Sequence, residues 1–199
     1  MSEIRAFIAF EFSEEIYSSL DKITIDLKNQ LAGLPIRWVP VHNIHLTLKF
    51  LGNITPFDID KLKKVLSEIT KSIPCIKITL FGAGTFPSYR RPRVIWIGMK
   101  YPPELAEFQR LLEDRTASEG FQREKHKFSP HITIGRVTKK AEKSESTEIG
   151  RILESLSIGH LGTDYLRKVH LFQSDLKRSG PVYSKLYTAS LSNEDSVIF

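Results

Sequence analysis

The chain has 199 residues, 41% of them hydrophobic, which is typical of one globular domain or two small joined lobes. No apolar run approaches the roughly 18–20 residues of a membrane-spanning helix, and the N-terminus lacks the features of a signal peptide, so we expect a cytoplasmic protein without membrane contact. The net charge of +6 favours anionic partners, and the single cysteine, Cys75, cannot form an internal disulfide or a thiolate metal site alone.

Hydrophobic periodicity in the first half of the chain alternates between strand and helix. In chain order we expect a strand over 4–12, a helix capped by Ser13 and ended near Gly33, a short extended segment at 36–39, a strand at 45–51, a helix opened by Thr55 and Pro56, and a strand at 75–86.

The second half repeats this order. We expect a strand at 93–99, a helix started by Pro102 and Pro103 and ended at Gly120, a strand at 131–137, a helix around 149–156, a strand at 168–176 and a final strand at 182–191. The polar segment 138–147 is interpreted as an exposed loop.

The matching order predicts an internal duplication, with approximate repeats over 4–87 and 92–177 and an added strand near 182–191. Phe7 precedes His45 by nearly the same interval as Val94 precedes His131. We therefore expect a single two-lobed α+β domain over 1–199, in which the lobes are related by a pseudo-twofold axis and enclose one cleft.

One short pattern occurs once in each half, as "HLTLKFLG" from His45 and "HITIGRV" from His131. In a strand, residues two apart point to the same face. His45 and Thr47 then share one face, and His131 and Thr133 repeat the arrangement. The opposite face of the first strand would carry three core residues: Leu46, Leu48 and Phe50.

Two imidazoles and two hydroxyls in one cleft suit phosphodiester hydrolysis. One neutral and one protonated histidine can act as general base and general acid, and hydroxyls can donate hydrogen bonds to phosphate oxygens. No histidine or carboxylate spacing is typical of a metal site, so we expect no metal. The other histidines (His42, His126, His160 and His170) are interpreted as loop, turn or solvent-facing residues.

These paired motifs resemble those of the two-histidine phosphoesterases and, more narrowly, of the RNA 2′,3′-cyclic phosphodiesterases, also called 2′-5′ RNA ligases. The resemblance extends over nearly the whole chain, through "IRAFIAFEF", "NIHLTLKFLGNI", "FGAGTFPSYRRPRVIWIGM", "FSPHITIGRV" and "GPVYSKLYTASL". It implies a bilobal α+β fold with two antiparallel sheets, flanked by helices, around a central cleft.

The resemblance also implies an activity and roles for the motif residues. The reaction would be hydrolysis of RNA 2′,3′-cyclic phosphate ends to 2′-phosphates, without metal or cofactor, with 2′-5′ joining of RNA ends as the reverse. His45 would protonate the departing 3′ oxygen, His131 would accept a proton from water, and Thr47 and Thr133 would hold the phosphate. We expect a monomer, with tRNA fragments among the candidate substrates.

Arg136 matches a basic position of the family, but it lies five residues after His131. An unbroken strand would point it to the opposite face, so it reaches the phosphate only if the strand bends or bulges, or if the side chain curls round its end. Lys49 has the parity of His45, with a stem interpreted as running toward solvent. Arg91 and Arg93 are candidates either for RNA phosphates or for surface salt bridges.

Two alternatives remain open at the level of sequence. The same site could act on small cyclic nucleotides or 2′-5′ oligonucleotides, or the chain could be a non-catalytic RNA-binding module. The intact histidines of both motifs weigh against the second, because phosphate binding alone does not call for two titratable groups.

Overall fold

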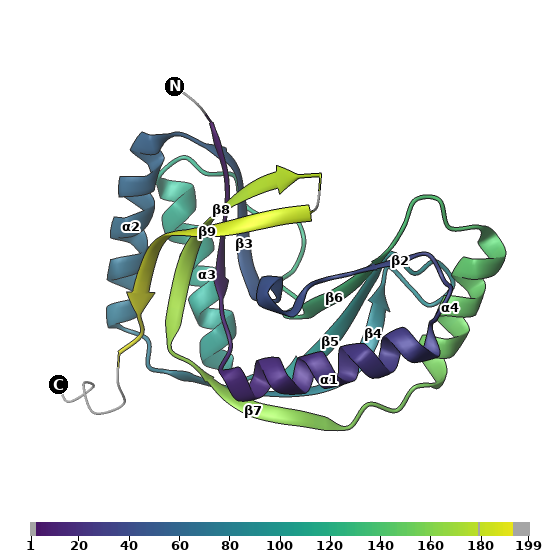
Figure 1. Ribbon diagram of the computed structural model, residues 1–199. Coiled ribbons are helices and arrows are strands. Elements are labelled where there is room, and N and C mark those ends of the chain that lie inside the picture. The colour runs from purple at the N-terminus through teal and green to yellow at the C-terminus, as the bar shows by residue number, and fades with distance from the viewer. Residues whose placement is uncertain (1–2, 179, 193–199) are drawn as a thin grey trace.

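The computed structural model describes residues 3–178 and 180–192, which form two antiparallel sheets with helices packed against them (Figure 1). The strands are β1 (Ile4–Phe10), β2 (Ile36–Trp38), β3 (Leu46–Ile54), β4 (Ile76–Phe86), β5 (Val94–Lys100), β6 (Ile132–Val137), β7 (His160–Leu166), β8 (Lys168–Lys177) and β9 (Gly180–Ser190). The helices are α1 (Glu14–Gln30), α2 (Pro56–Lys71), α3 (Pro103–Ser118) and α4 (Lys143–Ser155), with a 3-10 turn at Val41–Asn43.

Corresponding strands of the two halves take corresponding places in the two sheets. Sheet one has the order β3-β1-β8-β9, and sheet two has the order β2-β6-β5-β4-β7. If β3, β1 and β8 are matched with β6, β5 and β4, the two orders coincide and β2 is an additional edge strand. Both sheets contain strands from both halves of the sequence, because β4 joins sheet two and β8 joins sheet one. The lobes in space are therefore not the two halves of the chain.

The helices are exchanged in the same way. Helices α2 and α3 pack on sheet one, whereas α1 and α4 pack on sheet two (Figure 1). Helix α3 follows β5 of sheet two but places Phe108 against Phe10 of β1, with ring centroids 5.3 Å apart. One continuous apolar core consequently runs beneath both sheets. The opposite face of each sheet, which we call its open face, is left for the site.

Local signals explain where most helices begin. The Ser13 side chain accepts a hydrogen bond from the Ile16 backbone N–H at the start of α1. Thr55 and Asp58 form a reciprocal capping box at the start of α2, followed by Pro56 at the first helical position.

Two expectations for the second half were wrong. Helix α4 begins at Lys143, inside the segment interpreted as a loop, where the Glu142 backbone N–H donates to the Glu145 carboxylate at 2.7 Å. Its first turn is polar, so hydrophobic periodicity does not reveal it. His160, interpreted as a turn residue, instead begins strand β7 beside β4, a strand that was not expected, and the glycine at position 162 adopts φ +148° against α1.

Candidate active site

Strand β3 contains two bulges that rotate its later residues. Thr47 pairs with Ala9 and Phe50 pairs with Phe7, so Leu48 is left without a partner between them. Cross-strand partners share a face, which places Thr47 and Phe50 together on the open face. Phe50 is 59% exposed, so its assignment to the core was wrong. The bulge at Leu48 interrupts the strict alternation of side chains between the two faces that was assumed for this strand.

Strand β6 contains the equivalent bulge. Thr133 pairs with Trp96 and Arg136 pairs with Val94, so Ile134 is left without a partner. Since Val94 and Trp96 point to the same face of β5, Arg136 and Thr133 also share a face. The bulge therefore turns Arg136 to the open face. A bulge was one of the three ways, considered from the sequence, in which Arg136 could reach the phosphate. Arg37 of β2 pairs with Arg136 and adds a second guanidinium there.

The two motif histidines lie immediately before these strands and are held in the same way. Nδ1 of His45 is 2.8 Å from the Asn43 carbonyl oxygen, and Nδ1 of His131 is 2.7 Å from the Ser129 carbonyl oxygen. A carbonyl oxygen only accepts, so Nδ1 carries a proton in both rings. Nε2 of each ring is then the nitrogen available for proton transfer.

Aromatic rings surround His45 on the open face of sheet one. The ring centroids of Phe7 and Tyr183 lie 4.7 and 5.3 Å from that of His45. This burial lowers the pKa of His45 to about 4, although the hydrogen bond to Asn43 and the Glu11 carboxylate act in the opposite direction. His45 is therefore neutral at pH 7 without a ligand.

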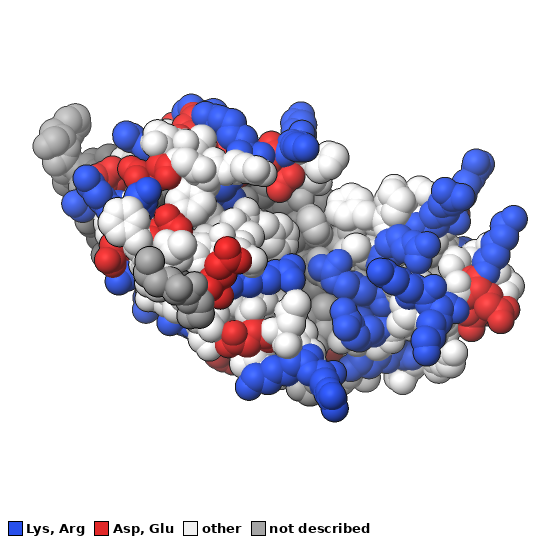
Figure 2. All heavy atoms as spheres, turned by 90° about the horizontal axis from the view of Figure 1, so that it is seen from above, with Lys and Arg blue, Asp and Glu red and all other residues white. Residues whose placement is uncertain are grey.

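Arg136 of sheet two lies close enough to His45 of sheet one for its charge to act on that ring. Arg136 contributes to lowering the pKa of His45, which lies in the other sheet. Burial raises the pKa of Tyr183, and Arg136, Arg5 and Arg37 oppose that rise. Lysine and arginine side chains also gather over the half of the molecule that holds sheet two (Figure 2). The open faces thus border one cleft, in which an anion is favoured.

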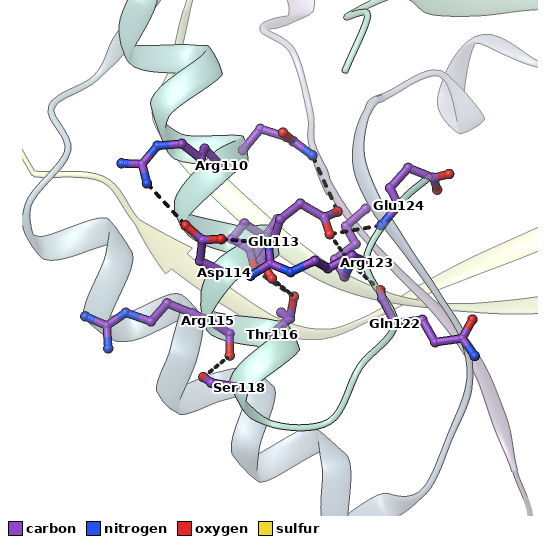
Figure 3. Close-up of polar contacts among 12 residues, drawn as sticks. Arg110, Glu113, Asp114, Arg115, Thr116, Ser118, Gln122, Arg123 and Glu124 are labelled. Atoms are coloured by element: carbon purple, nitrogen blue, oxygen red, sulfur yellow. Dashed lines mark hydrogen bonds and ion pairs between the residues drawn. The ribbon is translucent and has the colours of Figure 1, made fainter. Parts of the chain in front are cut away.

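Lys49 lies on the opposite side of β3 and does not point to solvent as expected. It is 3% exposed, and its Nζ lies 2.7 Å from the Glu113 carboxylate of α3 and donates to the Gln122 carbonyl at 2.8 Å. The Glu124 backbone N–H donates to the same carboxylate, and Figure 3 shows Glu113 pointing from α3 toward the segment that carries Gln122 and Glu124. Lys49 therefore ties β3 to α3 and to the segment that leads to His131.

A second polar cluster, missed from the sequence, lies beside His45. His170 is 4% exposed rather than solvent-facing, with Nδ1 2.9 Å from the Thr188 hydroxyl and Nε2 3.4 Å from the Glu11 carboxylate. Burial is the main cause that lowers its pKa to about 4. Lys185 pairs with Glu11 as well. The sequence signal for this cluster was that His170 and Phe172, two residues apart in an expected strand, share one face.

The surroundings of His131 are different. The Phe86 ring meets His131 edge-on, with centroids 4.9 Å apart. Arg91 and Arg93 are exposed near the start of β5, where a role in phosphate binding stays a prediction. Across residues 3–178 and 180–192, His, Cys, Asp and Glu side chains do not gather in a group of three that could hold a metal ion. The helices in the same ranges are too short or too polar to cross a membrane.

Comparison with known proteins agrees with this geometry. The model of the LigT like Phosphoesterase family matches the chain twice, over residues 11–96 and 97–183. An RNA 2′,3′-cyclic phosphodiesterase of Archaeoglobus fulgidus is 32% identical over 92% of this chain and 98% of its own length. The protein of the same name from Methanothermobacter thermautotrophicus is 28% identical over 92% and 97%.

Solved structures agree on the fold. A Thermus thermophilus protein superposes with a TM-score of 0.80 at 23% identity, covering 96% of this chain and 99% of the other. E. coli LigT in complex with 3′-AMP gives 0.76 at 24% identity, with 96% and 100% covered. With two matches to the family model that together span most of its residues, the chain belongs to the LigT-like phosphoesterase family.

Proposed function

We propose that the protein hydrolyses 2′,3′-cyclic phosphate ends of RNA to 2′-phosphomonoesters. The observation that carries the proposal is the pair of equivalent strands, β3 and β6. Each strand is preceded by a histidine whose Nε2 is available for proton transfer, and each contains a bulge that changes which side chains lie on its open face. The relatives named as RNA 2′,3′-cyclic phosphodiesterases support it over almost their full length.

In the proposed reaction, His131 Nε2 takes a proton from water as the water oxygen attacks phosphorus. The bond from phosphorus to the 3′ oxygen breaks, and His45 gives that oxygen a proton, so the phosphate stays on the 2′ oxygen. The hydroxyls of Thr47 and Thr133 donate to the non-bridging oxygens. Arg136 supplies a charged donor to the same oxygens, which strengthens its hydrogen bonds.

The acid role of His45 requires help from the substrate. Its pKa of about 4 in the unliganded cleft leaves the imidazole neutral at pH 7. A bound phosphate anion favours the protonated form by direct attraction and raises this pKa. We propose that substrate binding is the step that charges His45.

The same site would join two RNA ends through a 2′-5′ linkage when a 5′-hydroxyl takes the place of water as the nucleophile. We further propose that the protein acts as a monomer in the cytoplasm, with RNA fragments, including those of tRNA, as substrates. The net charge of +6 and the guanidiniums of Arg37 and Arg136 on sheet two support an RNA strand as the ligand.

Product analysis tests the proposal directly. A short RNA with a 2′,3′-cyclic phosphate should give the 2′-phosphate, with the same rate after prolonged chelation of divalent ions. A 3′-phosphate product, or a lost rate restored by one divalent ion, would contradict the mechanism. Higher kcat/KM on cyclic mononucleotides or 2′-5′ oligonucleotides than on the RNA would favour the small-nucleotide alternative, and RNA binding without turnover would favour the non-catalytic one.

A further inference from the structure

A cavity lies beside His131 on the open face of sheet two, and the hydrolysis proposed above does not use it. It has a volume of about 540 Å³, within the usual range of small-ligand pockets. We call it the Trp96 pocket. Its lining includes four aromatic residues and one lysine: Phe81, Trp96, Tyr101, Phe128 and Lys127. Ser129 and Pro130, which directly precede His131, also line it.

The indole of Trp96 lies flat against the sheet because two glycines make room for it. A Cβ atom at Gly84 would lie 2.4 Å from the indole ring, and one at Gly98 would lie 3.3 Å from it. The nitrogen Nε1 of Trp96 is buried without a hydrogen-bond partner among the described residues. A flat ring bordering an open cavity is a stacking surface for a planar ligand.

The Trp96 pocket is continuous with the catalytic residues. Trp96 is the cross-strand partner of Thr133. Its ring lies 5.3 Å from that of Phe86, and Phe86 lies 4.9 Å from His131. A ligand seated on Trp96 therefore approaches the phosphate from the side of His131.

A different cavity lies on the side of His45. It measures about 390 Å³ and is lined by Glu11, Tyr183 and Lys185 as well as His45 itself. A phosphate held between the two motifs would thus have a cavity on each side, with the pair Glu11 and Lys185 in one and Trp96 in the other. In an in-line displacement, the entering and departing oxygens also occupy opposite sides of phosphorus.

We infer that the Trp96 pocket binds the nucleoside that carries the 5′-hydroxyl, the group that replaces water in the joining reaction. This inference rests on the proposed function. His131 would take the proton of the 5′-hydroxyl as its oxygen bonds to phosphorus, the bond to the 3′ oxygen would break, and His45 would protonate that oxygen. The base of the incoming nucleoside stacks on Trp96, and Lys127 faces the phosphate that follows it in a longer strand.

The test compares two reactions that differ only in the group on the His131 side. One is hydrolysis of adenosine 2′,3′-cyclic phosphate, in which water occupies that side. The other is cleavage of a 2′-5′-linked adenosine dinucleotide to the cyclic phosphate and free adenosine, the reverse of joining. Trp96→Ala should lower kcat/KM for the dinucleotide by about 10- to 100-fold, the range of one lost base stack, and change cyclic phosphate hydrolysis by less than about 3-fold.

Matched variants keep the comparison interpretable. Trp96→Phe retains a ring and should recover most of the dinucleotide activity, and Trp96→Leu replaces Trp96→Ala if the smaller side chain lowers the melting temperature. Tyr165→Ala removes another exposed aromatic residue of sheet two, on its edge strand β7, and should change neither reaction.

Each remaining outcome overturns the inference. Equal losses in both reactions would place the base of the cyclic nucleotide in the Trp96 pocket, and no loss in either would leave the pocket without a role. A wild-type protein that hydrolyses the cyclic phosphate but does not cleave the dinucleotide would also overturn it. Failure of the wild type to hydrolyse cyclic phosphate ends at all would instead reject the proposed function.

Discussion

Strands β3 and β6 have the same backbone geometry as far as the bulges at Leu48 and Ile134. They differ in the side chains that follow these bulges. The residue after each bulged position is Lys49 in β3 and Gly135 in β6, and the next is Phe50 in β3 and Arg136 in β6. Strand β3 therefore buries the Lys49 cation behind the cleft and exposes the Phe50 ring in it. Strand β6 has a glycine, without a side chain, behind the cleft and places the Arg136 cation in it.

This difference separates two needs of phosphate chemistry. The β3 side provides an apolar environment, which holds the pKa of His45 at about 4. The β6 side provides charge through Arg136 and its neighbour Arg37. A duplicated strand can thus specialise without any change in backbone geometry, because the bulge fixes the direction and the side chain fixes the chemistry.

The largest expected effect comes from removing either imidazole. His45→Ala and His131→Ala should each lower turnover of a cyclic-ended RNA by roughly 10²–10⁴-fold, the usual contribution of a positioned acid or base. The melting temperature should change little for His131→Ala and should fall for His45→Ala, because the His45 ring packs against Phe7 and Tyr183. Near-normal turnover in either folded variant would remove paired acid–base catalysis. A substrate with a better 3′ leaving group should rescue His45→Ala, and rescue of His131→Ala instead would reverse the roles.

The buried cation of β3 should matter for stability. Lys49→Met leaves the Glu113 carboxylate buried and unpaired, which typically costs about 3–5 kcal/mol. The free energy of unfolding, from urea titration, should fall by this amount. Adding Glu113→Gln should recover a large part of the loss, because it removes the uncompensated charge. A loss below about 1 kcal/mol in Lys49→Met would contradict the assigned role of the ion pair.

The environment of His45 should appear in two pH profiles. The folded pKa of about 4 lies below the unfolded value near 6.5, so burial of the neutral ring stabilises the fold above pH 6.5, and this contribution is lost as pH falls toward 4. It amounts to up to about 3 kcal/mol. His45→Gln should make unfolding less sensitive to acid over this range. The His45 imidazole should also titrate near pH 4 when followed by NMR in the unliganded protein; a titration near 6.5 would contradict the shift.

The cation of β6 should affect both binding and the titration of the opposite histidine. Arg136→Met removes a charged donor to the phosphate, worth about 1.5–3 kcal/mol, or roughly one to two decades in kcat/KM. It should also raise the pKa of the His45 imidazole measured by NMR in the unliganded protein, since Arg136 lowers that pKa. Phe50→Leu, at the equivalent position of β3, is the matched control and should leave that pKa unchanged. Arg136→Met with normal kcat/KM would place the guanidinium outside the phosphate site.

The threonines should behave alike in the two strands. Thr47→Val and Thr133→Val keep the shape and the strand preference but delete the hydroxyl, with a loss of about 1.5–3 kcal/mol if the acceptor is a charged phosphate oxygen. Steady-state kinetics on the cyclic-ended RNA measure it. A loss in only one variant would show that the phosphate lies closer to one strand, and no loss in both would place it elsewhere.

Several elements could be predicted from the sequence because their signals are local. Alternating apolar residues indicated strands β1, β3 and β6, and the polar cap before Pro56 indicated the start of α2. The repeated spacing of histidine and threonine also located the motif residues. The start of α4 and strand β7 were not found, since a polar first turn and a strand interrupted by glycine lack that periodicity.

By itself, the sequence determined the order of most elements, the two H-x-T strands and the face that His45 and His131 share with their threonines. Only the tertiary structure decided that Arg136 and Phe50 turn into the cleft while Lys49 turns away, and that each sheet takes strands from both halves. The physical reason is that a bulge is defined by two strands together. One strand carries an extra residue relative to its partner, and the resulting change of face becomes visible only when the partner is known.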